Sequence, residues 1–167
     1  MIEFKKLAEF ERGTLYHLLC ESYSELLKAF PDHTEEYKQS WKTEDDNTFN
    51  YPDTIGKCVL VSVLNNEPIG FVSWDPRNIP EEGIIGQNCI LPAFRGKGYG
   101  KKQIEKVIEI FQSASTRVIK VTTADLPFFM PAQKTYLSCN FKINKHINTE
   151  AFGGLQLIEF EYKGDIK

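Results

Sequence analysis

The stretch Ile90-Leu91-Pro92-Ala93-Phe94-Arg95-Gly96-Lys97-Gly98-Tyr99-Gly100-Lys101 decides how the rest of this chain is interpreted. Its three glycines stand at alternate positions, and an amphipathic helical pattern follows them directly. Glycine lets the backbone adopt positive φ and approach a ligand closely. The first N–H groups of a helix, together with the helix dipole, favour an anion at that end. The stretch therefore predicts an anion-binding turn between a strand and a helix.

Two better-known phosphate loops do not fit this stretch. A Walker loop needs a glycine five residues before a Gly-Lys pair and a Ser or Thr after it, but Gly100-Lys101 has Arg95 and Lys102 there. A dinucleotide fingerprint needs a third glycine three residues after the second, where this chain has Lys101. A plain connecting turn with solvated lysines is the other interpretation, but three glycines lose more backbone entropy than such a turn requires. The pattern that remains is Arg-x-x-Gly-x-Gly.

This pattern resembles the acetyl-coenzyme A loop of the GNAT superfamily of N-acetyltransferases, in which Gln or Arg-x-x-Gly-x-Gly or Ala follows a central strand. Here the run 84–91 is predicted to be that strand, and Pro92 ends it. The resemblance implies that the loop amides bind the pyrophosphate of acetyl-CoA as co-substrate. The cofactor-binding residues it implies are Cys89, Ile90, Leu91, Arg95, Gly96, Lys97, Gly98, Tyr99, Gly100 and Lys101.

A second stretch, from Ala132 to Phe141, resembles the GNAT pattern Ala-x-x-x-Tyr-x-x-x-Gly-Phe. Tyr136 stands where many relatives have a tyrosine that protonates the departing coenzyme A thiolate, so the resemblance implies that Tyr136 is catalytic. A tyrosine on a helix is otherwise usually a packing residue. Asn140 replaces the usual glycine, and asparagine also enters the left-handed region. Phe129 stands where relatives often have a coenzyme-binding asparagine, so that contact is not inherited.

Direct attack of a bound amine on the thioester is the mechanism that the resemblance implies, with amides near Asn88 stabilising the oxyanion at a bulge. A relay through Cys89 is disfavoured because no histidine is placed to activate the thiol. The general base stays unassigned. The candidates, each of which is also explained as an ordinary surface group, are His17, Asp75, Glu81 and Glu82.

Composition narrows the class of protein. The 167 residues, 41% hydrophobic and 26% charged, suit a single domain over residues 1–167. No apolar run is long enough for a bilayer and no secretory signal begins the chain, so we expect a cytoplasmic protein without membrane contact. The net charge of −3 argues against nucleic-acid binding. Scattered cysteines at 20, 58, 89 and 139 predict buried thiols and no metal site.

The periodicity of apolar residues predicts an α+β fold, in the order expected of GNAT proteins. We expect a mixed, mostly antiparallel sheet of about seven strands flanked by about four helices. The expected strands are 2–7, 57–64, 69–74, 84–91, 117–123, 141–147 and 155–162, and the expected helices are 15–30, 34–43, 99–113 and 131–138. A loop is expected at Glu44-Asp45-Asp46-Asn47.

The function that the sequence favours is an acetyl-CoA-dependent N-acetyltransferase acting on a small-molecule or peptide amine, as a monomer or homodimer. A non-catalytic sensor that binds acetyl-CoA or another acyl-CoA is the alternative. Aromatic and acidic residues of the first two helices would suit a cationic amine, but an amphipathic helix pair shows the same residues to core and water. They are Tyr16, Tyr23, Phe30, Tyr37 and Trp41 with Glu21, Glu25, Glu35 and Glu36.

Overall fold

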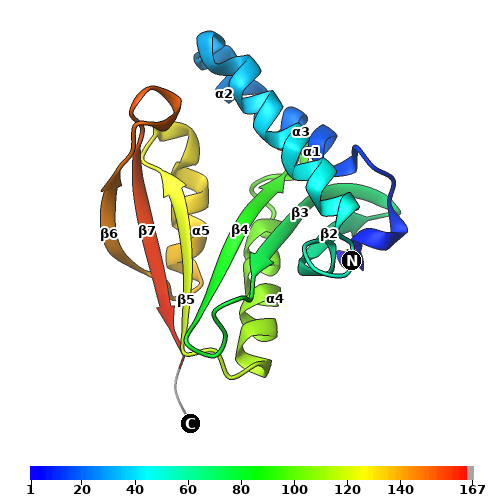
Figure 1. The fold of residues 1–167 in the computed structure, drawn as a ribbon, viewed down its shortest axis with the longest axis vertical. Coiled ribbons are helices and arrows are strands. Elements are labelled where there is room, and N and C mark those ends of the chain that lie inside the picture. The colour runs from blue at the N-terminus through cyan, green and yellow to red at the C-terminus, as the bar shows by residue number, and fades with distance from the viewer. Residues whose placement is uncertain (165–167) are drawn as a thin grey trace. The chain divides into compact units, whose positions relative to one another are not determined.

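The structure, a computed structural model, describes residues 1–164 apart from the side chain of Phe152. Within these residues, seven strands form a sheet in the order β1-β2-β3-β4-β5-β7-β6 (Figure 1). The strands are β1 (Glu3–Lys6), β2 (Val59–Leu64), β3 (Glu67–Asp75), β4 (Glu82–Ile90), β5 (Val118–Ala124), β6 (Lys142–Asn148) and β7 (Gln156–Lys163). The α-helices of the same residues are α1 (Thr14–Ser22), α2 (Ser24–Ala29), α3 (Thr34–Asn50), α4 (Tyr99–Ser113) and α5 (Met130–Ser138). The α+β fold with a mostly antiparallel sheet is confirmed.

The chain divides into two compact units that both draw on β3 and β4. Unit 1 consists of residues 1–73 and 87–99, and unit 2 consists of residues 74–86 and the chain from Gly100 onward. In unit 1, β2 pairs antiparallel with β1 and with β3. In unit 2, β5 pairs parallel with the first part of β4 and antiparallel with β7, and β7 pairs with β6.

The hairpin of unit 1 forms where the sequence predicts it. Leu64 of β2 faces Glu67 of β3, so Asn65 and Asn66 are the two loop residues. Both have positive φ, 52° and 66°, as a type I′ hairpin turn requires. Asparagine tolerates this left-handed geometry better than most residues do. The hairpin thus follows from two residues whose local preference matches the turn.

The first expected helix, 15–30, is divided into α1 and α2 at Tyr23. This residue has φ −106° and ψ 18°, outside the helical region. Its hydroxyl donates to the backbone carbonyl of Asn88 on β4, at 3.1 Å. Because the apolar stripe continues through the break, the sequence pattern shows one helix, and the described residues contain five α-helices rather than four.

The loop expected at 44–47 is wrong, because α3 runs through this acidic stretch to Asn50. Two of its acidic side chains have specific partners. Asp45 is fully buried, and its carboxylate accepts the backbone N–H groups of Gly13, Leu15 and Tyr16 at the start of α1, at 2.8 to 3.2 Å. Asp46 forms ion pairs with Lys42 and Arg12. Long-range partners therefore decide the structure here, and a local pattern does not contain them.

In unit 2, helices pack on strands through large aromatic side chains. An added Cβ at Gly83 of β4 would lie 2.3 Å from the ring of Phe111 on α4, so only glycine fits under that helix. On α5, the Tyr136 ring lies 5.4 Å from the Phe160 ring of β7, measured between centroids. Asn140, which follows α5, has φ +67°, which confirms the left-handed residue predicted at this helix end.

We predict that Asp45→Ala lowers the free energy of unfolding by about 2–3 kcal/mol, because buried N–H donors of α1 lose their acceptor. Urea unfolding followed by circular dichroism measures this loss. The neighbouring Asp46→Ala is the matched control, since it removes an exposed ion pair and should cause a clearly smaller loss. Equal losses for the two variants would contradict the assignment of Asp45 as the cap of α1.

Candidate active site

The glycine loop has the open backbone shape that an anion-binding turn needs. After the short 3-10 turn Pro92–Phe94, Gly96 and Gly98 adopt φ of +74° and +80°, and an added Cβ at either would meet no atom within 4 Å. Tyr99 then begins α4, whose first N–H groups have no acceptor inside the helix. Glycine is thus required here for backbone conformation, while the space beside the backbone stays open for a ligand. The residues present fit a pyrophosphate group.

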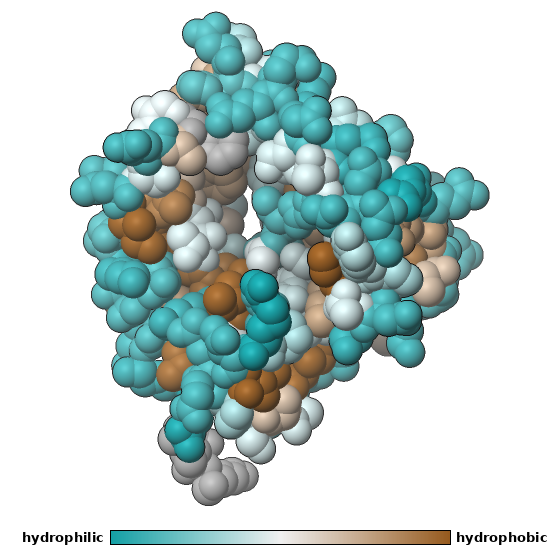
Figure 2. Space-filling view, in the orientation of Figure 1, coloured by the Kyte–Doolittle hydropathy of each residue, from teal (hydrophilic) through white to brown (hydrophobic). Residues whose placement is uncertain are grey.

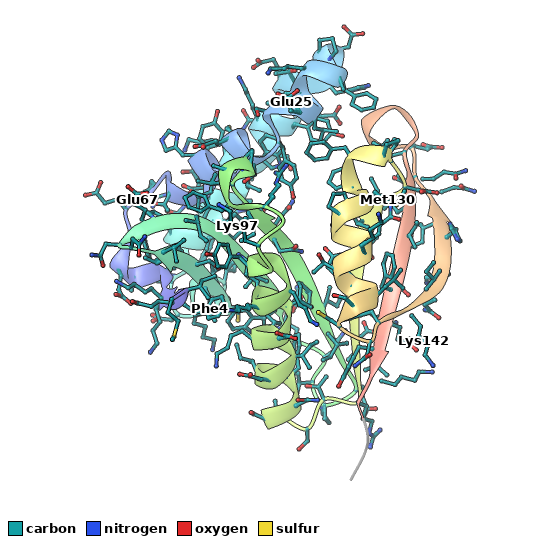
Figure 3. All side chains as sticks on the ribbon, turned by 180° about the vertical axis from the view of Figure 1, so that it is seen from behind. Phe4, Glu25, Glu67, Lys97, Met130 and Lys142 are labelled. Carbon is teal, nitrogen blue, oxygen red and sulfur yellow. The ribbon has the colours of Figure 1, made fainter. Side chains whose placement is uncertain are left out.

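Two cations of the loop bind the protein's own backbone. Arg95 donates through Nε to the Ile90 carbonyl at 2.9 Å and through Nη2 to the Ser22 carbonyl at the end of α1. Lys97, labelled in Figure 3 in the loop before α4, donates to the Ala93 carbonyl at 3.1 Å and lies over the Phe94 ring. The side chains of Arg95 and Lys97, both predicted cofactor residues, thus help to hold the loop in its conformation.

The end of β4 places side chains in the core of unit 1. Cys89, Ile90 and Leu91 are 6%, 9% and 9% exposed. The Leu91 amide donates to the Ile69 carbonyl at 2.8 Å, which fixes the strand end next to β3. Burial raises the pKa of the Cys89 thiol to about 11, so little thiolate forms near neutral pH. A buried, mostly neutral thiol is a poor nucleophile.

Tyr136, the predicted catalytic tyrosine, is 3% exposed. Besides Phe160, its ring also contacts Phe141, with the centroids 6.1 Å apart, so the ring is fixed by packing. Phe129 ends the short turn before α5 and packs edge-on against Phe128 at 5.0 Å. Lys101, the last predicted cofactor residue, lies 3.8 Å from the Glu105 carboxylate in the first turns of α4.

The carboxylates considered as the general base each have a cation as partner. Asp75 binds Arg77 through two atoms of the guanidinium, and this hydrogen bonding lowers the pKa of the Asp75 carboxyl. Glu81 pairs with Arg117, and Glu82 pairs with Lys120. For Asp75, the lowered pKa means less tendency to take a proton. His17 is exposed on α1 and contacts the Tyr16 ring.

Glu44 is a candidate that the sequence interpretation missed, because it placed this residue in a loop. It lies on α3 one turn after Trp41 and next to Asp45. Burial and, secondly, the charge of Asp45 raise the pKa of Glu44 from 4.5 to about 7. Within residues 1–164, no ion pair or hydrogen bond to the Glu44 carboxylate offsets this burial. A carboxyl group with these properties can accept a proton near neutral pH.

No group of three or more His, Cys, Asp or Glu side chains in the described part of the chain could hold a metal ion. Among the helices of residues 1–164, none is long and apolar enough to cross a membrane.

The comparisons with known proteins agree with this arrangement. The model of the acetyltransferase (GNAT) family matches residues 14–141, which is most of the chain and includes the glycine loop and Tyr136. The chain therefore belongs to the GNAT acetyltransferase family. A search of curated proteins found no match.

Solved structures share the whole fold at low sequence identity. The PaiA N-acetyltransferase from Thermoplasma acidophilum, in complex with coenzyme A, is 19% identical, with a TM-score of 0.72 over 97% of this chain and 99% of that chain. YncA from Salmonella typhimurium, with its cofactor acetyl-CoA, is 15% identical, with a TM-score of 0.67 over 100% and 95% of the two chains. The NatC complex bound to Gag peptide and CoA is 18% identical, with a TM-score of 0.67 over 98% and 99%. Coenzyme A or acetyl-CoA is thus bound by several proteins of this fold.

We predict that Glu44→Gln gains stability relative to the wild type as pH rises. Below about pH 4.5 the Glu44 carboxyl is protonated in both the folded and the unfolded state, so it causes no loss of stability. Between about pH 4.5 and 7 it ionises more readily in the unfolded state, which destabilises the fold increasingly. The relative gain between pH 4 and pH 8 should be roughly 2 kcal/mol, after a discount for the part of the side chain that water reaches. Chemical denaturation at a series of pH values measures it.

Glu109→Gln makes the same chemical change at an exposed ion pair on α4, and its stability curve should run parallel to that of the wild type. A constant difference between Glu44→Gln and the wild type over this pH range would contradict the raised pKa of Glu44.

Proposed function

We propose that this GNAT protein is an N-acetyltransferase that transfers the acetyl group of acetyl-CoA to an amine. The observation that carries this proposal is the glycine loop, where Gly96 and Gly98 keep an open, positive-φ backbone directly before α4. When bound, acetyl-CoA supplies a thioester carbonyl carbon that accepts the nitrogen lone pair, and the C–S bond breaks as the C–N bond forms. The chain's own residues bind the pyrophosphate, orient the acetyl group and move protons.

The cofactor-binding residues are the backbone of the strand end and loop, from Cys89 to Lys101. Because the cations of Arg95 and Lys97 are engaged with backbone carbonyls, we assign pyrophosphate binding to the N–H groups of Gly96, Gly98 and Gly100. Backbone amides near Asn88 donate to the carbonyl oxygen as negative charge develops on it. Next to them, the Ser73 hydroxyl of β3 donates to the Gln87 carbonyl at 3.3 Å.

We assign the proton donor for the leaving sulfur to Tyr136, on the strength of its place in the family pattern and the packing that fixes its ring. A phenol with a pKa of about 10 can protonate a thiolate whose conjugate acid has a pKa of about 8.5 once charge has developed on sulfur. The acceptor is a primary amine of a small molecule or of a peptide.

The acidic residues on α1, α2 and α3 favour a cationic acceptor. Glu21, Glu25, Glu35 and Glu36 are all exposed, and the α2 end of unit 1 is largely hydrophilic in Figure 2. Tyr37 and Trp41, by contrast, are 9% and 4% exposed and belong to the core. The acidic side chains, and not these aromatic rings, are therefore the part of this surface that an ammonium group would meet.

Incubation with acetyl-CoA and a panel of amines tests the function, with free thiol release as the readout. The panel contains primary alkylamines, diamines, an aminoglycoside and peptides with a free α-amino group. Tyr136→Phe should lower kcat about 10²-fold while leaving coenzyme A affinity unchanged, because the hydroxyl acts only on the leaving group. Tyr51→Phe, at an exposed tyrosine, is the matched control.

Binding of acetyl-CoA without thiol release for any amine would favour the non-catalytic sensor over the enzyme. Full turnover of Tyr136→Phe with an accepted amine would remove Tyr136 from the mechanism but leave the function in place.

We predict that Gly98→Val weakens binding of coenzyme A at least about tenfold, because a β-branched residue is strained at positive φ and its side chain enters the open space of the loop. Isothermal titration calorimetry measures the affinity. Gly154→Val is the matched control, since Gly154 has a similar φ of +83° in the turn before β7. If both variants bind coenzyme A like the wild type, the loop is not the pyrophosphate site.

A further inference from the structure

We propose that Glu44 of α3 is the general base that removes a proton from the acceptor ammonium group before the amine attacks the thioester. This inference rests on the proposed function and names a catalytic residue that neither the glycine loop nor the family pattern identifies. The residues that support it all lie in unit 1.

Tyr23 links α3 to the second half of β4. Tyr23, between α1 and α2, stacks on Trp41 of α3 with the centroids 5.5 Å apart. The same Tyr23 donates its hydroxyl proton to the Asn88 carbonyl of β4 at 3.1 Å. Tyr23 therefore connects α3 at Trp41 with β4 at Asn88, where we place the thioester.

Glu44 is the neighbour of Trp41 on the surface of α3, since residues three apart on a helix lie next to each other. The charge of Glu44 is also close enough to Cys89 to contribute to the raised pKa of that thiol. Asp45, the next residue, is fixed by α1, so α3 cannot rotate without breaking the cap. Glu44 is thereby held in place on α3, near enough for its charge to act on Cys89.

Several charged and titratable groups lie around Glu44. On its own helix, the charge of Asp45 opposes ionisation of Glu44. On β4, the Cys89 thiol is neutral near pH 7 because it is buried. After β4, the positive charge of Arg95 acts on Cys89, but its guanidinium is bound to the carbonyls of Ile90 and Ser22. The hydroxyl of Tyr23 is bound to the Asn88 carbonyl. Glu44 is accordingly the carboxylate of this region that can exchange a proton near neutral pH.

The nitrogen loses two protons in the reaction. The second leaves after attack and, through water, restores the proton that Tyr136 gives to the leaving sulfur, and the first is the one that Glu44 takes. One proton moves from the ammonium nitrogen to a carboxylate oxygen of Glu44, which leaves a lone pair on nitrogen and a neutral carboxyl group. Glu44 then returns to the carboxylate by releasing this proton to water. The overall acetylation of an ammonium ion releases one proton, and Glu44 is the group through which that proton leaves.

The test uses Glu44→Gln in the full chain with the amine that the wild type acetylates fastest. We expect kcat/KM at pH 7.5 to fall about 10²-fold and the rise of kcat/KM with pH near 7 to disappear. The loss should shrink for an acceptor amine whose pKa lies below the assay pH, because such an amine arrives without the extra proton. Glu44→Asp should recover part of the rate, and Glu109→Gln should behave like the wild type.

Controls separate catalysis from folding. Coenzyme A affinity and the melting temperature of Glu44→Gln at pH 7.5 should be no lower than those of the wild type. A purely structural Glu44 would instead lower kcat/KM equally at every pH and for every amine, and this result would overturn the proposal.

The failure of this inference is distinguishable from failure of the proposed function. If the wild type transfers acetyl groups and Glu44→Gln keeps its rate and pH profile, only the assignment of Glu44 is wrong. If the wild type acetylates no amine, the proposed function is wrong. In that case a carbon-13 NMR titration still decides the property on which the inference depends, since a Glu44 carboxyl that titrates below about pH 5.5 cannot serve as this base.

Discussion

The buried carboxylate of Asp45 is the interaction on which unit 1 depends. It belongs to α3 but accepts the N–H groups of Gly13, Leu15 and Tyr16, which would otherwise lie without acceptors at the start of α1. The same contact fixes the rotation of α3 about its axis. As a result, Trp41 stacks on Tyr23, while Lys42 and Asp46 form their ion pair at the surface. One long-range contact thus sets both the helix packing and the chemistry next to it.

The parts of the fold that the sequence predicts are those in which local preference and final structure agree. Asn65, Asn66 and Asn140 all adopt the positive φ that asparagine tolerates, and Gly96 and Gly98 adopt the positive φ that the loop requires. The parts that the sequence does not predict depend on distant partners. The acidic stretch 44–47 resembles a loop in the sequence because the N–H groups of α1 that donate to Asp45 are far away along the chain. The helix break at Tyr23 likewise goes with a hydrogen bond from Tyr23 to Asn88 of β4. The glycine loop could be predicted because its conformation follows from local residue preferences. Glu44 could not, because its surroundings depend on residues far away in the sequence.

Under the proposed function, the glycine loop binds an anion with little use of side-chain charge. Arg95 bridges the carbonyls of Ile90 and Ser22, so it connects the end of β4 to the end of α1. Lys97 closes the turn on itself through the Ala93 carbonyl. These contacts hold the loop conformation from within the protein, so under the proposed function the N–H groups need little rearrangement to bind an anion. A preformed site loses less conformational entropy on binding, which makes the missing asparagine at Phe129 easier to tolerate.

Glu44 and Asp45 are adjacent carboxylates on one helix, yet their surroundings give them different roles. Asp45 is satisfied by N–H donors, and its burial supports the fold. Glu44 has no such donors within residues 1–164, and burial beside Asp45 raises its pKa to about 7. Ionisation of Glu44 consequently destabilises the protein at the pH where an acetyltransferase would need a base. A Glu44 carboxylate paired with a cation would destabilise the fold less, but it would also accept protons less readily. The property that lowers the stability of unit 1 at this position is therefore the one that lets Glu44 act as the proposed base.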